Sequence, residues 1–161
     1  MGKYESEARL EDRMIDQLVK QGYSKVVIDD VNDLENNFRE HNKVELKGNN
    51  LSDKEFERLM VKISGKGVFQ SAKELRQKQD IQRDDGSIIY LELFNTKDWC
   101  KNIFQVTHQT TVEGKYTNRY DVTILINGLP LVQVELKRRG VDMKEAFNQI
   151  KRYKRHSYQG L

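Results

Sequence analysis

The stretch "RYDVTILINGLPLVQVELK", which spans residues 119–137, decides the fold of this chain. Apolar and polar residues alternate on both sides of Asn127 and Gly128, a dipeptide that favours a tight turn. This pattern predicts two antiparallel strands whose side chains point alternately to opposite faces. On the second strand one face is apolar and is expected to pack, while the other face, which carries Glu135 and Lys137, is expected to open to a cleft.

The pairing register of these strands determines whether Asp121 and Glu135 meet. A two-residue turn at Asn127 and Gly128 would pair Asp121 with Val134 and send the two carboxylates to opposite faces. A three-residue loop with Gly128 in a left-handed bulge would instead place Asp121 diagonal to Glu135. Diagonal neighbours lie roughly 7 Å apart at Cβ, a gap that two carboxylates can bridge onto one cation. We therefore expect an odd loop or a bulge at Gly128.

A carboxylate two residues before a lysine occurs four times in the sequence, beginning at Glu45, Glu113, Glu135 and Asp142. The tetrapeptide "VELK" itself occurs twice, at 44–47 and 134–137. In a strand the two side chains share a face, whereas in a helix they point apart. The first copy lies in a solvated helix end or loop by its neighbours, and the copies at Glu113 and Asp142 lie in a turn and at a helix start. Only Glu135 is expected in a strand, so its copy is the candidate for chemistry.

The first half of the chain is predicted to be mainly helical. Apolar residues at helical spacing predict a helix over Tyr4 to Gln21, followed by a possible short strand over Lys25 to Ile28. The segment from Val31 to Arg76 reads as several short helices, a helical insert. Within it, "SDKE" at 52–55 and "SAKE" at 71–74 both fit the capping box of a helix N-terminus.

From Ile88 the period of the pattern changes to two, which predicts a series of strands. A helix over Asp142 to Tyr158 follows, with one apolar face and one basic face. The order of helix, helical insert, strands and helix predicts an α/β architecture in layers. A chain of 161 residues with 33% charged and 37% hydrophobic residues fits a single globular domain over 1–161.

Charge and cysteine content indicate what the chain binds and in which compartment it is found. Residues 115–161 hold ten Lys and Arg against four Asp and Glu, although the whole chain carries only +3. A surface that faces phosphate groups is therefore expected in this last third. The single cysteine, Cys100, cannot form an internal disulfide, and no apolar run is long enough to span a membrane. These features predict a cytoplasmic protein without a membrane partner.

Three elements of the sequence resemble the PD-(D/E)xK nuclease superfamily: Asp121, then "ELK" at 135–137, then "QIKRY" at 149–153 on the following helix. The last of these resembles the Q-x-x-x-Y motif of the RecB-like branch. The resemblance implies a restriction-endonuclease-like fold, with a three-layer core in which helices flank a mixed β-sheet. Tyr120 stands where the superfamily name has proline, which removes no ligand.

More narrowly, the sequence from Asn118 to Tyr153 resembles the N-terminal nuclease domain of the R subunit of type I restriction-modification enzymes, and the likeness covers nearly the whole chain. It implies a Mg²⁺-dependent endonuclease that cuts double-stranded DNA without reading its sequence. It also implies methyltransferase and specificity subunits as partners. In such subunits an ATP-driven translocase follows this domain, and ATP serves only that longer protein. The chain has no G-x-x-x-x-G-K-[ST] phosphate loop, so we expect it to be a fragment of a longer subunit.

The resemblance also implies roles for the residues that match its motifs. Asp121, Glu135 and the backbone carbonyl of Leu136 would hold Mg²⁺. Lys137 would orient or deprotonate the attacking water and offset charge on the phosphate, which requires surroundings that perturb its pKa.

Other candidates lie on the two outer helices. Gln149 and Tyr153 would order the site or the DNA backbone, and Glu11 would reach the metal through water, since the family uses an acidic residue on its first helix. Glu11 also fits a surface charge at the edge of the apolar stripe. A last group of residues could bind DNA phosphates or simply form a solvated helix face: Lys144, Lys151, Arg152, Lys154 and Arg155.

Two alternatives to a restriction nuclease remain open from sequence. One is another enzyme of the same fold, such as a structure-specific resolvase. The other is a non-catalytic module that docks to DNA and to the translocase, and is active only in the full complex.

Overall fold

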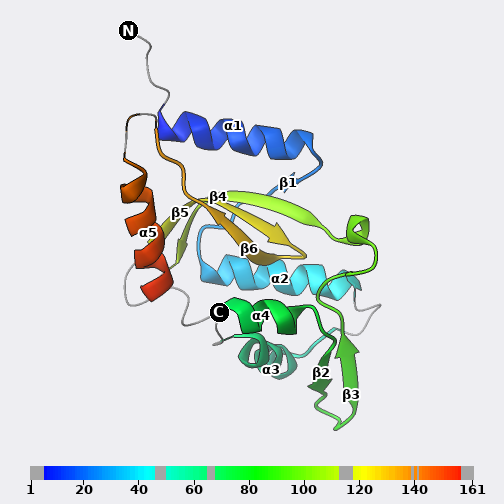
Figure 1. The fold of residues 1–161 in the computed structure, drawn as a ribbon. Coiled ribbons are helices and arrows are strands. Elements are labelled where there is room, and N and C mark those ends of the chain that lie inside the picture. Colours follow the sequence, from blue (N-terminus) through cyan, green and yellow to red (C-terminus); the bar gives the residue numbers. More distant parts are fainter. Residues whose placement is uncertain are drawn as a thin grey trace.

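The computed structural model describes residues 6–45, 50–64, 68–112, 118–138, 140 and 142–156. Its centre is a four-stranded sheet in the order β1, β4, β5, β6 (Figure 1). The strands are β1 (Ser24–Lys25), β4 (Phe104–Val112), β5 (Asn118–Ile126) and β6 (Leu129–Val134). β1 runs parallel to β4 and the other neighbours are antiparallel, so the sheet is mixed.

Helix α1 (Glu7–Lys20) covers one face of this sheet. Ser6 begins the helix by accepting a hydrogen bond from the backbone N–H of Arg9. Ile15 is buried against Val106 and Val122, which project from neighbouring strands toward the helix. The helix that the apolar spacing predicted is thereby confirmed.

Helix α2 (Val31–Glu45) covers the opposite face. Leu34 packs against Leu125 of β5. The side-chain amides of Asn37 and Gln105 bind each other reciprocally, at 3.0 and 3.1 Å, and so satisfy two polar groups under the helix. The sheet therefore lies between two helical layers, which confirms the α/β fold class.

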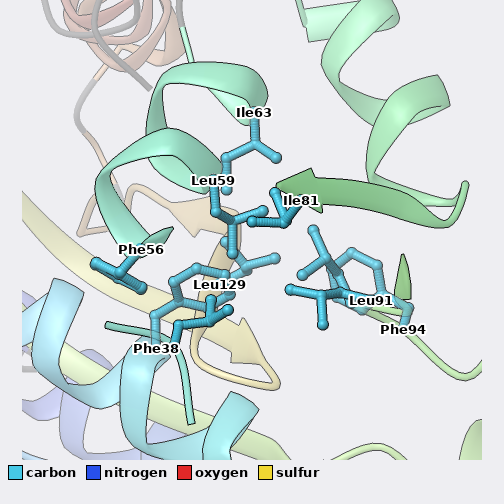
Figure 2. Close-up of a cluster of buried hydrophobic side chains, with 10 residues drawn as sticks. Phe38, Phe56, Leu59, Ile63, Ile81, Leu91, Phe94 and Leu129 are labelled. Carbon is cyan, nitrogen blue, oxygen red and sulfur yellow. The ribbon is translucent and has the colours of Figure 1, made fainter. Parts of the chain in front are cut away.

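The remaining elements form a second hydrophobic cluster beside α2. Helices α3 (Asp53–Ile63) and α4 (Val68–Leu75) pack with a two-stranded sheet of β2 (Gln79–Gln82) and β3 (Ile88–Leu91). Leu59 and Ile81 lie inside the cluster that Figure 2 shows, together with Phe38 of α2 and Leu129 of β6. Through these last two residues the cluster is continuous with the central sheet. A 3-10 turn at Trp99–Lys101 connects β3 to β4.

One of the two predicted capping boxes is present. Ser52 and Glu55 cap α3 reciprocally, side chain to backbone in both directions. Ser71, by contrast, lies inside α4, which begins three residues earlier at Val68. The prediction of the second capping box was therefore wrong. The four-residue pattern does not reveal whether the residues before it are already helical.

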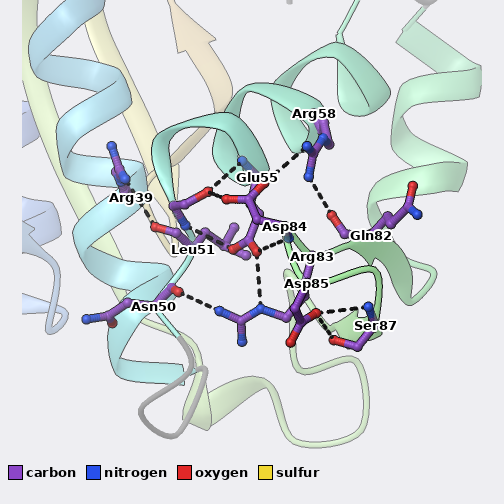
Figure 3. A network of polar contacts seen from close by, with 11 residues as sticks. Arg39, Asn50, Leu51, Glu55, Arg58, Gln82, Arg83, Asp84, Asp85 and Ser87 are labelled. Carbon is purple, nitrogen blue, oxygen red and sulfur yellow. Dashed lines mark hydrogen bonds and ion pairs between the residues drawn. The ribbon is translucent and has the colours of Figure 1, made fainter.

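The carboxylate of Glu55 also joins α3 to the β2–β3 turn (Figure 3). Only 2% of this residue is exposed. It accepts hydrogen bonds from the backbone N–H of Ser52 at 2.9 Å, the backbone N–H of Asp84 at 3.0 Å and Nε of Arg83 at 3.2 Å. The two backbone donors lower the pKa of Glu55 and outweigh the opposing effect of burial, with a further contribution from Arg83.

The hairpin of β5 and β6 corrects the expected turn. Asn127 and Gly128 form a two-residue turn with φ of 51° and 81°, and Ile126 pairs with Leu129. The register then shifts by one residue, because Leu125 pairs with Pro130 whereas Ile124 pairs with Val132. The extra residue is Leu131, so the bulge lies in β6 and the expected odd loop or bulge at Gly128 was wrong.

The final helix, α5 (Met143–His156), is present as predicted. Its first turn is capped by Asp142, whose carboxylate accepts a hydrogen bond from the backbone N–H of Lys144. Met143, Phe147 and Ile150 are 78%, 60% and 51% exposed. These residues of the predicted apolar face are thus exposed in the part of the chain that the structure describes. Among those residues, no helix is long and apolar enough to cross a membrane.

Candidate functional site

Asp121 and Glu135 meet at the open end of the β5–β6 hairpin. Val122 pairs with Val134 and Thr123 with Gln133, so the same register carried one step further sets Asp121 opposite Glu135. Glu135 lies just beyond β6 and not within it, contrary to expectation. There Oδ2 of Asp121 accepts a hydrogen bond of 2.8 Å from the backbone N–H of Leu136. The bulge therefore supplies the parity that places both carboxylates on one side.

The environment of Glu135 disfavours its charge. Burial raises the pKa of Glu135, and the neighbouring charge of Asp121 and a carboxyl–carboxylate contact with that residue raise it further. The hydrogen bond and charge of Lys137 act in the opposite direction without cancelling these effects. The acidic pair thus favours a nearby cation, and in this structure Lys137 supplies one.

Lys137 lies beside the acidic pair. Its Nζ donates a hydrogen bond of 2.7 Å to Oε1 of Glu135 and lies 4.0 Å from Oε2 of Glu7. Burial lowers the pKa of Lys137, but the hydrogen bond and charge of Glu135, with the charges of Glu7 and Asp121, raise it above the ordinary 10.5. In this arrangement the side chain is a stable ammonium, able to donate hydrogen bonds and offset negative charge. It is not poised to accept a proton.

A cavity of about 470 Å³ opens next to this group. It is lined by residues from the start of α1, the segment after β6, and α5: Ser6, Glu7, Lys137, Arg138, Glu145 and Gln149. Gln149 and Lys137 thus line the same cavity, while the role of Gln149 in ordering the site stays a prediction. The volume suffices for a phosphate group with its surrounding water.

Sequence reasoning missed Glu7, which lines this cavity. Its Oε1 accepts a hydrogen bond of 3.4 Å from the backbone N–H of Arg138, and its Oε2 is the oxygen near Lys137. The sequence could have indicated Glu7 by its position four residues before Glu11, because this spacing places both side chains on one side of α1.

Glu11 lies apart from the acidic pair. Only 8% of it is exposed, and its Oε2 accepts a hydrogen bond of 3.3 Å from Nε2 of Gln109 on β4. Within the described residues no three His, Cys, Asp or Glu side chains gather closely enough to hold a metal ion. A direct contact of Glu11 with a metal is thus not built into this arrangement, and a contact through water stays a prediction.

Helix α5 carries several basic residues that were predicted to bind DNA phosphates. Lys144, Lys151 and Arg152 are exposed. The side chains of Tyr153, Lys154 and Arg155 lie outside the described part of the chain, as does Lys47 of the first "VELK" copy.

The donors at the hairpin end suit a hard divalent cation. Asp121 and Glu135 offer carboxylate oxygens side by side, and such cations prefer oxygen ligands. Burial, and then the charge of Asp121, raises the pKa of Glu135 even with Lys137 in contact, so a further cation beside the pair would be stabilised. Two carboxylates and a backbone carbonyl leave further coordination positions to water, as Mg²⁺ prefers.

A mixed sheet between helical layers, with an acidic pair and a lysine at the end of a hairpin, defines a restriction-endonuclease-like fold. The chain belongs to the family of the type I restriction enzyme R protein N terminus, whose model matches residues 4–161. The resemblance seen in the sequence is thereby confirmed.

Curated relatives carry names of the same kind. The endonuclease subunit of type I restriction enzyme SauCOLORF180P from Staphylococcus aureus (strain COL) is 57% identical over 98% of this chain and 17% of its own length. That of SsaAORF53P from Staphylococcus saprophyticus is 52% identical with the same coverage. That of EcoprrI from Escherichia coli is 40% identical over 96% of this chain and 51% of its own length. The chain thus spans 17% of the length of these staphylococcal relatives.

Proposed function

We propose that this chain is the DNA-cleaving domain of a type I restriction enzyme and hydrolyses phosphodiester bonds of double-stranded DNA with Mg²⁺. The observation that carries the proposal is the contact of Asp121, Glu135 and Lys137 at one end of the hairpin. Family membership supports it, because the relatives are named endonuclease subunits.

In the proposed site, Asp121, Glu135 and the backbone carbonyl of Leu136 would hold Mg²⁺. The bound ion supplies charge neutralisation at the phosphate and lowers the pKa of a coordinated water. The adjacent carboxylates and the raised pKa of Glu135 support this assignment. Glu11 is assigned to the outer waters of the ion, since its buried carboxylate projects from α1 one turn after Glu7.

Lys137 acts as a cation in this proposal. Its raised pKa favours donation to a phosphate oxygen, or orientation of the attacking water, over proton abstraction. If Glu135 held the metal, its hydrogen bond with Lys137 would weaken, and the ammonium would be available to the substrate. Gln149, which lines the same cavity, would orient the DNA backbone there together with Tyr153.

The basic side of α5 is proposed to bind DNA phosphates. Contacts of this kind depend on charge and carry no sequence information. The residues assigned to it are Lys144, Lys151, Arg152 and Arg155. Sequence reading is accordingly assigned to a separate specificity subunit, and a methyltransferase subunit and an ATP-driven motor to the longer assembly. We place the whole assembly in the cytoplasm.

A second candidate is a docking module that contributes to cutting only within a complete enzyme. The exposed apolar residues Met143, Phe147 and Ile150 of α5 favour it, because such a row is suited to contact another protein surface. A resolvase-like enzyme is disfavoured, because the family match extends over residues 4–161, including the helical insert.

The test is Mg²⁺ binding by calorimetry and nicking of supercoiled plasmid, each with wild type, Asp121→Ala and Lys137→Ala. Asp12→Ala and Lys25→Ala, at exposed positions on α1 and β1, are the matched controls. We expect Asp121→Ala to lose metal binding and both site variants to lose nicking. Metal binding without nicking by wild type would favour the docking module. Unchanged metal binding in Asp121→Ala would refute the site assignment.

A further inference from the structure

Gln109 has an unusual backbone for a residue in the middle of a strand. Its φ is 58°, in the left-handed region, although β4 continues on both sides. The flanking pairs, His108 with Val122 and Thr110 with Tyr120, keep one register, so no extra residue explains the irregularity. A left-handed φ is unfavourable for any side chain with a Cβ and favours glycine. A glutamine in this position therefore requires a compensating role for its side chain.

The side chain of Gln109 reaches α1. In a regular strand Gln109 would share a face with Thr107, two residues earlier. The opposite face of β4, which carries Val106, is the one that packs against α1. Nε2 of Gln109 instead donates a hydrogen bond of 3.3 Å to Oε2 of Glu11. The left-handed backbone and this contact with a buried carboxylate occur together at one residue.

The backbone of Gln109 also lies next to that of the acidic pair. The register of β4 and β5 sets Gln109 opposite Asp121, and the register of β5 and β6 sets Asp121 opposite Glu135. The backbones of the three residues thus form a row across the end of the sheet, in the order Gln109, Asp121, Glu135. The amide that holds Glu11 is thus attached to the strand next to the proposed metal ligands.

We infer that Gln109 is a positioning residue of the nuclease site. Its strained backbone directs the amide to α1, where it holds the carboxylate of Glu11 in the orientation that serves the outer waters of the metal. This inference rests on the proposed function. It predicts that the amide matters for metal binding while the strain that accompanies it costs stability, so the two properties are separable by mutation.

Two substitutions separate them. Gln109→Gly removes the amide and also relieves the left-handed strain, whereas Gln109→Ala removes the amide and keeps the strain. We expect both variants to weaken Mg²⁺ binding to a similar extent, on the order of tenfold, as is typical when a group supporting a metal site is removed. We expect Gln109→Gly to melt at a temperature equal to or above that of wild type, and Gln109→Ala below Gln109→Gly. Gln82→Ala, at an exposed glutamine of β2, is the control.

The measurements are calorimetric Mg²⁺ affinity and thermal unfolding of the full 161-residue chain. In a Glu11→Gln background, Gln109→Gly should produce no further loss of affinity, since its effect passes through that carboxylate. Wild-type affinity in Gln109→Gly, or affinity that follows melting temperature across the variants, would overturn the inference. Asp121→Ala is measured alongside: if it also binds Mg²⁺ normally, the proposed function itself fails, whereas loss only in Asp121→Ala rejects the role of Gln109 alone.

Discussion

Lys137 and Glu135 illustrate how the surroundings of a residue define its chemistry. The sequence presents a carboxylate and a lysine two positions apart, a combination that occurs four times in this chain. Only at Glu135 do the described residues bring a second acid, Asp121, against the first. Burial, with the charge of Asp121, raises the pKa of Glu135, and the hydrogen bond and charge of Glu135 raise the pKa of Lys137. The lysine therefore carries its proton in the metal-free protein. The identity of these residues was predictable, but their protonation depends on neighbours from other elements, such as Glu7.

Removing the lysine charge should separate metal binding from catalysis. In Lys137→Met we expect Mg²⁺ affinity to be retained or increased, because the ammonium no longer competes for Glu135. We expect nicking to fall by roughly a hundredfold or more, the scale for removing one hydrogen-bond donor to developing negative charge. Calorimetry and plasmid nicking measure the two effects, with Lys25→Met as the control. Loss of Mg²⁺ binding in this variant would contradict competition between the ammonium and the metal.

Gly128 is required for a reason that sequence alone could not supply. A Cβ on it would lie 2.5 Å from Cα of Phe38, and its φ of 81° already disfavours other residues. We expect Gly128→Ala to lower the free energy of unfolding by about 3 kcal/mol, from overpacking and backbone strain together. Gly22→Ala is the control, because φ there is 99° and nothing lies within 4 Å of an added Cβ. Urea unfolding should show a loss at least twice that of the control; equal losses would mean that the contact with Phe38 relaxes.

At the level of elements, periodicity predicted most helices and strands, and failed where tertiary contacts decide. β2 (Gln79–Gln82) was missed because its short, mostly polar sequence has little of a strand pattern, yet burial of Ile81 in the insert cluster holds it in place. The turn at Asn127 has the form its dipeptide favours, while the bulge at Leu131 leaves no signature in the sequence. The sequence therefore predicted that an irregularity in the hairpin must bring Asp121 and Glu135 together, but not that a bulge in β6 would provide it.

The junction of α3 with the β2–β3 turn should make stability depend on pH. Hydrogen bonds from the backbone N–H groups of Ser52 and Asp84 hold the pKa of Glu55 below its ordinary value of 4.5. A carboxyl with a depressed pKa stabilises the fold above its unfolded pKa, and this contribution is lost as pH falls through the folded pKa. We expect the melting temperature of wild type to fall below about pH 4.5.

Glu55→Gln should remove part of this dependence and lower stability near neutral pH by about 1–3 kcal/mol, because a buried charged acceptor is lost. Glu57→Gln, at an exposed position on the same helix, should behave as wild type. Melting curves from pH 3 to pH 7 compare the three proteins. A Glu55→Gln variant with the full wild-type dependence would show that other carboxyl groups account for it.

For the whole molecule, α2 is the element that joins two hydrophobic cores. Leu34 packs against the central sheet through Leu125, and one turn later Phe38 packs into the cluster of α3, α4, β2 and β3. The sequence predicted an insert and a single domain. The division of α2 between two cores was not readable from it, because apolar spacing tells which side of a helix is buried but not against what.

This arrangement predicts that both cores unfold together. We expect Phe38→Ala to cost about 3–5 kcal/mol, the range for removing a buried aromatic side chain, and to preserve one cooperative transition. Phe147→Ala, at a residue that is 60% exposed, is the matched control and should change stability little. Urea unfolding is followed by circular dichroism and by the fluorescence of Trp99, the single tryptophan. Transitions at different urea concentrations would mean that the insert is an independent unit.

The extra residue in β6 also constrains how the gene for this domain can change. Deleting the codon for Leu131 would give the hairpin an uninterrupted ladder from its turn to its end. Val132 would then follow Pro130 directly, and Asp121 would still lie opposite Glu135. The bulge therefore lets the strand carry one additional codon between Gly128 and Glu135 without separating the two carboxylates. A change of length in this short stretch leaves the acidic pair together only where a bulge forms or disappears with it.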